Sequence, residues 1–160
     1  MRQYIGTKII NAKSINRADY NTFRGWQLPE NENGADEGYL VEYTDGGKPN
    51  VEGFAGYVSW SPKEQFDKAY RSTDAMNFGL AVEALKKGLK VTREGWNGKG
   101  MFLYYVPANS YPAQTEAAKE TFGALVPYRA YIAMKTVQND VQVWTASQTD
   151  VLADDWLVVA

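Results

Sequence analysis

Residues Asn77–Val106 read NFGLAVEALKKGLKVTREGWNGKGMFLYYV, and this stretch decides the fold of the C-terminal part of the chain. Its pattern predicts a helix, a strand, a glycine-rich loop and a second strand. Asn77 is a good N-cap, and apolar residues recur after it at helical spacing. The runs Leu89–Arg93 and Met101–Val106 predict an antiparallel hairpin, with Asn97-Gly98 as a typical turn dipeptide.

The loop between the two predicted strands carries a tryptophan among glycines. Residues Arg93–Gly100 read REGWNGKG. Glycine tolerates positive φ, so this backbone is able to approach a ligand or another chain closely. A large aromatic side chain near a hairpin tip needs cover. For Trp96 that cover is another part of the fold, a second subunit or a bound ring.

Upstream of this unit, the chain predicts a separate small domain. Tyr4–Ile10 is rich in β-formers and predicts a strand, and Arg17–Arg24 predicts a helix. Asn16 caps that helix and Gly25 ends it. Two further strands are expected at Gly38–Tyr43 and Phe54–Trp60.

The stretch that follows these strands predicts a capped helix. Ser61 is expected as its N-cap, Pro62 as its first residue and Glu64 as the partner in a capping box. The helix Pro62–Tyr70 should bury Phe66, Ala69 and Tyr70. A short polar joint follows it. The sequence therefore predicts an N-terminal domain at 1–73 and a second domain at 74–160.

The remainder of the second domain alternates short strands and helices. Pro107–Pro112 predicts a loop, because its two prolines cannot donate to a strand ladder. The later elements are expected, in chain order, as a helix Gln114–Phe122 and strands Tyr128–Lys135, Val141–Trp144 and Asp155–Val159. The fold class is α+β, with two small domains that each combine an antiparallel sheet with short helices.

Composition removes several classes of function. The chain has no histidine and no cysteine, so the commonest general base, the commonest metal ligand and any disulfide are missing. A formal net charge of −2 argues against DNA or RNA as a partner. No apolar run reaches the length of a membrane span, and the N-terminus does not resemble a signal peptide. We expect no membrane association, no cofactor and no metal.

The sequence offers no case for an enzyme. Asp154 and Asp155 are adjacent, so on a strand they point to opposite faces and we expect structural or surface roles. Ser147 has no nearby base, and its spacing to Asp150 is typical of a helix cap. The loop glycines lack the strand–turn–helix context of a dinucleotide fingerprint. No catalytic residue is assigned.

Binding is better supported. Arg93, Trp96, Asn97 and Lys99 supply a planar cation, a stacking face, an amide and a point charge, a combination that suits a nucleotide. The alternative for each tryptophan is core packing, which we favour for Trp156 because it opens the apolar run WLVV. The full set of candidate ligand-binding residues is Arg93, Trp96, Asn97, Gly98, Lys99, Trp144, Ser147, Gln148, Thr149 and Asp150.

Three ordered blocks carry a resemblance to a known family. They are MNFGLAVEALKKGLKVTREGWNGKGMFL, AYIAMKT and VWTASQTDVLADDWLVV, which span nearly all of Met76–Ala160. They resemble a family of small phage proteins that includes the second type of Thoeris anti-defence protein. The earlier stretch GYLVEYTDG…GYVSWSPKEQFDKAYR is similar to a module common in small phage proteins, which indicates a phage origin and no chemistry.

The resemblance implies a phage-encoded protein that acts in the host cell cytoplasm as a sponge. Members of the family bind the immune signal glyco-cyclic ADP-ribose without cleaving it, and some take cyclic oligonucleotides. They assemble as homotetramers with ligand pockets between subunits. By this resemblance, the loop with Trp96 and Asn97 lines the pocket, and the SQTD segment at 147–150 lies close by.

Two alternatives stay open at this level. The first is an interaction module that blocks a host defence protein, and the second is a sponge for cyclic di- or trinucleotides. An enzyme that degrades the same signal is disfavoured by the missing histidine, cysteine and metal cluster.

Overall fold

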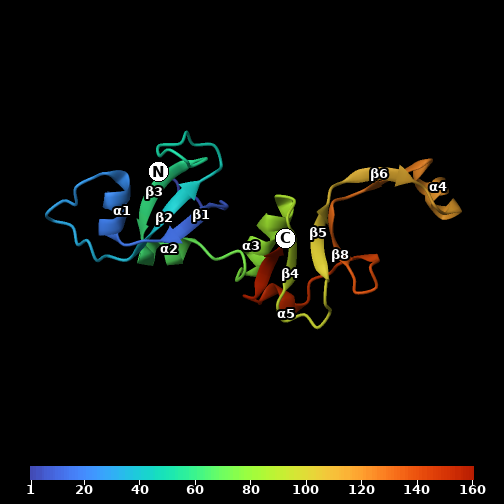
Figure 1. Cartoon of the computed structure of the whole chain (residues 1–160). Helices are drawn as coiled ribbons and strands as arrows, with labels where there is room; N and C mark the ends of the chain where they lie inside the picture. Colours follow the sequence, from blue (N-terminus) through green and yellow to red (C-terminus); the bar gives the residue numbers. More distant parts are fainter. The chain divides into compact units, whose positions relative to one another are not determined.

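The computed structural model describes residues 1–160, which form two compact units, Met1–Arg71 and Ser72–Ala160 (Figure 1). Each unit combines antiparallel strands with short helices, so the predicted α+β class is confirmed. None of the helices is both long and apolar enough to cross a membrane.

The first unit is built on a three-stranded antiparallel sheet in the order β1-β2-β3. Its core gathers Tyr20, Leu40 and Val58, with Trp60 packed against them. Its elements are β1 (Asn11–Ser14), α1 (Arg17–Arg24), β2 (Gly38–Tyr43), β3 (Tyr57–Pro62) and α2 (Lys63–Ala69).

Local signals predicted α1 correctly. Asn16 is its N-cap and accepts a hydrogen bond from the backbone N–H of Asp19. Gly25 ends the helix with a positive φ of 67°, a conformation that glycine adopts without strain. Helix α1 therefore occupies the predicted residues.

Two other predictions in this unit are wrong. Tyr4–Ile10 forms no strand, and the edge strand is instead the polar β1, which pairs with β2. Ser61 does not cap α2, because it lies within β3, paired with Tyr39. Pro62 is the N-cap residue and makes no side-chain bond.

Helix α2 also differs from its prediction, since none of its residues is buried. Ala69 is exposed, and Phe66 is half-buried. The Phe66 ring stacks on Tyr39 of β2 with 4.0 Å between centroids and contacts Tyr70 at 4.9 Å. This aromatic contact attaches α2 to the central strand of the sheet.

The second unit is built on a five-stranded antiparallel sheet in the order β10-β4-β5-β8-β9. The predicted hairpin is confirmed, since β4 pairs antiparallel with β5. The sheet strands are β4 (Lys90–Arg93), β5 (Phe102–Val106), β8 (Tyr131–Lys135), β9 (Val141–Val143) and β10 (Trp156–Val159).

One helix covers one face of this sheet. Helix α3 (Phe78–Lys86) begins at the N-cap Asn77, whose side chain accepts the Leu80 N–H, as the sequence predicted. It buries Ala81, Ala84 and Leu85. These side chains pack with the core residues of the sheet, which are Val91, Leu103, Met134 and Trp156. The prediction that Trp156 belongs to the core is confirmed.

The chain between β5 and β8 forms an arm, defined here as residues Asn109–Tyr128. Strand β6 (Asn109–Pro112) pairs antiparallel with β7 (Leu125–Tyr128), and α4 (Glu116–Phe122) connects them. The prediction of a loop at Pro107–Pro112 is therefore wrong. A two-stranded ribbon has both outer edges free, and prolines are tolerated at such edges. In Figure 1 the arm leads away from β5 and β8.

Candidate ligand-binding site

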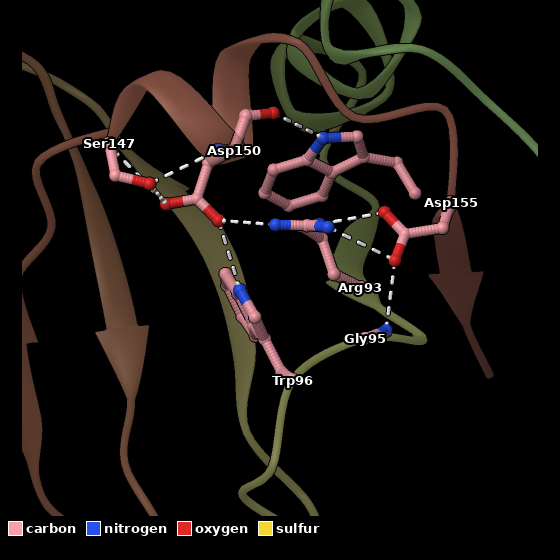
Figure 2. A network of polar contacts seen from close by, with 7 residues as sticks. Arg93, Gly95, Trp96, Ser147, Asp150 and Asp155 are labelled. Atoms are coloured by element: carbon pink, nitrogen blue, oxygen red, sulfur yellow. Dashed lines mark hydrogen bonds and ion pairs between the residues drawn. The ribbon is translucent and has the colours of Figure 1, made fainter.

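The centre of the site is an arginine held between two carboxylates (Figure 2). Arg93 ends β4, and its Nε and Nη2 donate to the two oxygens of Asp155 at 2.7 and 3.2 Å. Its Nη1 donates to Asp150 Oδ1 at 2.9 Å. Strand pairing accounts for the contact between Arg93 and Asp155. Trp156 of β10 pairs with Arg93 of β4, which places the preceding residue, Asp155, at the end of β4.

Asp150 joins the loop after β4 to the helical turn α5 (Gln148–Val151). Its Oδ1 accepts from Trp96 Nε1 at 3.1 Å as well as from Arg93. Its Oδ2 accepts from the Ser147 hydroxyl at 2.7 Å and the Ser147 backbone N–H at 3.1 Å. The Ser147 hydroxyl in turn accepts the Asp150 N–H, which completes the predicted capping box.

The surrounding donors keep both carboxylates charged. Burial opposes the charge of Asp150, but hydrogen bonds from Ser147, Arg93 and Trp96 outweigh it and lower the pKa of Asp150 from 3.8 to about 2. The Arg93 hydrogen bond, against the opposing effect of burial, lowers the pKa of Asp155, and the Gly95 N–H adds to it at 2.9 Å. Asp155 and Asp150 together raise the pKa of Arg93. The three groups form one charge-assisted network.

Three tryptophans pack beside this network. Trp156 is fully buried and donates its Nε1–H to the Asp150 carbonyl at 3.0 Å. Trp96 lies edge-on to Trp156, with 5.5 Å between ring centroids, and Trp144 lies edge-on to it at 5.9 Å. Trp96 and Trp144 are each half-buried, with their rings 6.3 Å apart. Part of each ring therefore faces out of the unit.

Comparison with known proteins identifies the C-terminal unit. The model of the Thoeris anti-defense 2-like domain matches residues 76–159. The chain is also similar to a protein named Thoeris anti-defense 2 from Bacillus phage SP01. The two are 40% identical over 88 residues, which cover 53% of this chain and 96% of the relative.

The chain belongs to the Thoeris anti-defense 2-like family. Phage anti-defence is the function that this membership supports. The matched residues contain the whole Arg93 network, whereas Met1–Ala75 lies outside the match. The candidate site is thus part of the family domain.

The structure brings together five of the residues that the sequence singled out. Arg93, Trp96, Trp144, Ser147 and Asp150 lie in or against the network. Three of the five Arg93 N–H donors are bonded to Asp155 and Asp150, and Asp150 can meet a ribose hydroxyl only by releasing one of its own donors. The geometry favours positioning roles for both.

The other candidates have different surroundings. Asn97, Lys99, Gln148 and Thr149 are exposed, and none of their side chains has a partner within the chain. Gly98 is half-buried, and a Cβ there would lie 2.0 Å from Met101 Sδ and 2.8 Å from Val137 Cγ1. Gly98 allows close packing within the loop, and the four exposed side chains stay available to a ligand.

The structure answers one question about the loop, the source of cover for Trp96. Another part of the fold supplies at least part of its cover, since Trp96 packs against the main core cluster and donates a hydrogen bond to Asp150. Asp155 was expected to be structural, and its place beside Arg93 agrees. Sequence spacing gave no sign of that pairing, since the residues are 62 positions apart.

The first unit carries an open cleft of its own, of about 540 Å³. Its wall includes Asn16, Asp19, Tyr39 and Lys63. Asn16 and Asp19 bond each other, and Lys63 is paired with Asp67 at 2.6 Å. These polar groups are already engaged, so the cleft is a weaker candidate than the Arg93 network.

Proposed function

We propose that this chain captures a nucleotide-type immune signal, of the glyco-cyclic ADP-ribose kind, and holds it without cleaving it. The coarser function, phage anti-defence, comes from the family. One observation supports the more specific proposal that the chain captures a nucleotide-type signal. Arg93, Asp150 and Asp155 bond one another, while Asn97, Lys99, Gln148 and Thr149 stay exposed beside two half-buried tryptophans.

This arrangement suits recognition of a nucleotide. The open parts of Trp96 and Trp144 offer apolar ring surface to a base, and a stacked base contributes about 1–3 kcal/mol. The Asn97 amide has both donors and an acceptor for a base edge. The Lys99 ammonium is a point charge for phosphate, and hydrogen bonds to a charged group are stronger than neutral ones.

The Arg93 network serves this site as a frame. It joins β4, the following loop, α5 and the start of β10 through side chains that are only 13% exposed for Arg93 and Asp150. A frame that holds the exposed groups before the ligand arrives reduces the entropy that binding must overcome. Pre-organised contacts of this kind support tight capture.

The same network disfavours hydrolysis. A general acid must carry a proton near neutral pH, but the pKa of Asp150 is about 2 and that of Asp155 is also lowered. As bases, both carboxylates already accept hydrogen bonds from Arg93. We therefore propose binding without catalysis, in the cytoplasm of the infected cell, by a homotetramer whose subunits complete the cover of the two rings.

The test is capture of the signal by the purified full chain. Free glyco-cyclic ADP-ribose is measured by mass spectrometry as protein is added, and the protein is then heated to release what it holds. We expect depletion that follows protein concentration and is complete at the first time point, with the intact signal recovered. A cleaved product, or loss that exceeds the number of sites, contradicts the proposal.

Variants connect capture to the site. Lys99→Ala and Asn97→Ala remove exposed side chains and leave the network intact, so they should weaken capture by roughly tenfold each, the value of about 1.4 kcal/mol. Lys87→Ala is the matched control, since it removes a lysine that is also exposed and lies just after α3. An equal loss of affinity in Lys87→Ala would contradict the assignment of Asn97 and Lys99 to the binding site. Cyclic di- and trinucleotides, run in parallel, show which signal is preferred.

A further inference from the structure

The first unit carries a row of contacting aromatic rings that is only partly covered, called here the aromatic row. Tyr20 of α1 is buried and contacts both Phe23 and Trp26, each with 6.2 Å between ring centroids. Phe23 in turn lies edge-on to Phe54 at 5.8 Å. Trp26 and Phe23 are 52% and 42% exposed, although both lie against the core residue Tyr20. Exposed apolar side chains that form one continuous surface are typical of a binding site.

Arg24 is held in place on this row. Its guanidinium carbon lies over the Trp26 ring, 4.2 Å from the centroid. Its Nη1 donates to the Tyr20 hydroxyl at 3.0 Å and to the Val58 carbonyl at 3.4 Å. The backbone N–H of Trp26 donates to the Asn21 carbonyl at 2.8 Å, which fixes the ring under the guanidinium. The charged group is therefore oriented before any ligand arrives, which reduces the entropy that binding must overcome.

Arg24 lacks an acidic partner in the chain. Its Nε and Nη2 donate no hydrogen bond, and no carboxylate pairs with it. Arg93 shows what these two nitrogens bind, since its Nε and Nη2 hold the two oxygens of Asp155 at 2.7 and 3.2 Å. Arg17, which is also half-buried, is paired with Glu32 at 2.5 Å. Arg24 is thus an oriented arginine whose carboxylate-binding pair of donors is unused.

The surroundings of Arg24 define the chemistry of a partner. A carboxylate on its two free nitrogens makes charge-assisted hydrogen bonds, which strengthen when apolar groups exclude water. Arginine and aromatic residues are also the residues that contribute most at protein–protein interfaces. A nucleotide would bring a phosphate to the same nitrogens, but only one base to a row of several rings. An acidic protein segment with apolar side chains complements the whole surface.

We propose that the aromatic row and Arg24 form a docking site for an acidic segment of a partner protein. An aspartate or glutamate of that segment binds Nε and Nη2 of Arg24, and a neighbouring aromatic or aliphatic side chain packs on Phe23 and Trp26. The site lies outside the family match at 76–159, and it does not depend on capture of a nucleotide signal.

Selection from a displayed library of short random peptides tests the chemistry of the partner. The purified full chain and its Arg24→Gln variant are used as parallel baits. We expect the wild type to enrich aspartate and glutamate several-fold beside aromatic or aliphatic residues, and the variant to lose the acidic preference. The same consensus with both baits, a consensus without an acidic residue, or no enrichment at all overturns the proposal.

The affinity of the strongest selected peptide tests the geometry of the site by fluorescence anisotropy of the labelled peptide. Arg24→Lys keeps the charge but loses the paired donors, so binding should weaken by about tenfold or more. Trp26→Ala should weaken it similarly, and because it removes an exposed side chain it keeps the test valid if Arg24→Lys unfolds. Lys48→Ala is the control, since it removes an exposed cation of the same unit.

The outcomes separate a docking site from its alternatives. Chemical denaturation first establishes that the first unit of each variant is folded. Equal weakening in Lys48→Ala would show non-specific charge attraction and overturn the proposal. Adenosine monophosphate that binds more tightly than the selected peptide, and loses binding in Arg24→Gln, would assign the surface to a nucleotide and also overturn it. Signal capture is measured separately, so its failure contradicts only the proposed function.

Discussion

Replacing Asp150 with asparagine should destabilise the C-terminal unit at neutral pH. The carboxylate accepts four hydrogen bonds, two at each oxygen, from Arg93 and Trp96 on one side and from Ser147 on the other. An asparagine in the same shape has one oxygen and one NH₂ group. If the NH₂ group faces Arg93 and Trp96, both of those hydrogen bonds are lost. If it faces Ser147, the Ser147 backbone N–H loses its acceptor, while the hydroxyl can turn and accept from the amide.

The size of the effect follows from the pKa of Asp150. Folding lowers this pKa from 3.8 to about 2, and one pKa unit corresponds to about 1.36 kcal/mol. The charged form is therefore favoured by about 2 kcal/mol in the folded chain. Since the asparagine also leaves at least one donor facing its NH₂ group, we expect a total loss of roughly 2–3 kcal/mol in the free energy of unfolding. For a unit of this size that lowers the melting temperature by roughly 10–20 °C.

The sign of the pH dependence gives a second check. A pKa that is lowered by folding adds stability above the unfolded value of 3.8, and this contribution is lost as the pH falls toward about 2. The wild type should therefore lose its advantage over Asp150→Asn through this acid range. Asp155, whose pKa is also lowered, remains in the variant, so some acid sensitivity persists in both chains.

Native-state hydrogen exchange of amides in β4, β5 and β10 measures the effect within the full chain, apart from the N-terminal unit. Asp154→Asn is the matched control, because Asp154 is exposed and its side chain bonds nothing in the chain. A free energy of unfolding for Asp150→Asn within about 0.5 kcal/mol of the wild-type value at pH 7 would be no larger than the effect of a typical surface substitution. That result, or an equal loss in the control, would refute the assigned importance of the network.

Three further predictions concern folding. Gly56→Ala should destabilise the first unit by at least about 1–3 kcal/mol, because its Cβ would lie 1.8 Å from the Tyr43 carbonyl oxygen; chemical denaturation compares it with Gly6→Ala, whose Cβ meets nothing within 4 Å. Asn77→Ala should cost about 1 kcal/mol by removing the cap of α3, read from exchange of the first α3 amides. A fragment of residues 72–160 should melt cooperatively, and one that starts at Met76 should melt lower because it loses the Val158 N–H bond to the Thr73 carbonyl.

Local signals in the sequence were enough for several elements. Asn16 and Asn77 cap α1 and α3, and Ser147 with Asp150 forms the expected capping box. These signals act over three or four residues, so they do not depend on the rest of the fold. The hairpin of β4 and β5 is equally local.

Predictions failed where pairing between distant strands overrides local preference. Ser61 and Pro62 resemble a helix start, yet pairing with Tyr39 and Gly38 of β2 extends β3 through both. The apolar run Tyr4–Ile10 has a higher strand propensity than Asn11–Ser14, but the ladder with β2 forms at the latter. Strand propensity is a weak guide at a sheet edge, where backbone pairing decides.

The candidate site depends on the same long-range pairing. Arg93 and Trp96 were predicted to bind a ligand because their side-chain chemistry is visible in the sequence, whereas their hydrogen-bond partners, Asp155 and Asp150, are distant in it. The register of β10 against β4 brings Asp155 to Arg93, and α5 brings Asp150 to both. With those partners known, Arg93 and Asp150 act as internally paired positioning residues. The neutral side chains of Asn97, Gln148 and Thr149 are the ones left exposed to a ligand.

The candidate site of the C-terminal unit leaves a ligand only partly enclosed within one chain. A small unit whose charged groups are internally paired has few side chains left to enclose a ligand, and here they lie beside two tryptophans that are half-buried in one chain. Full enclosure strengthens each polar contact by excluding water. If the subunits of the proposed homotetramer supply that enclosure, assembly should become tighter when the signal is bound.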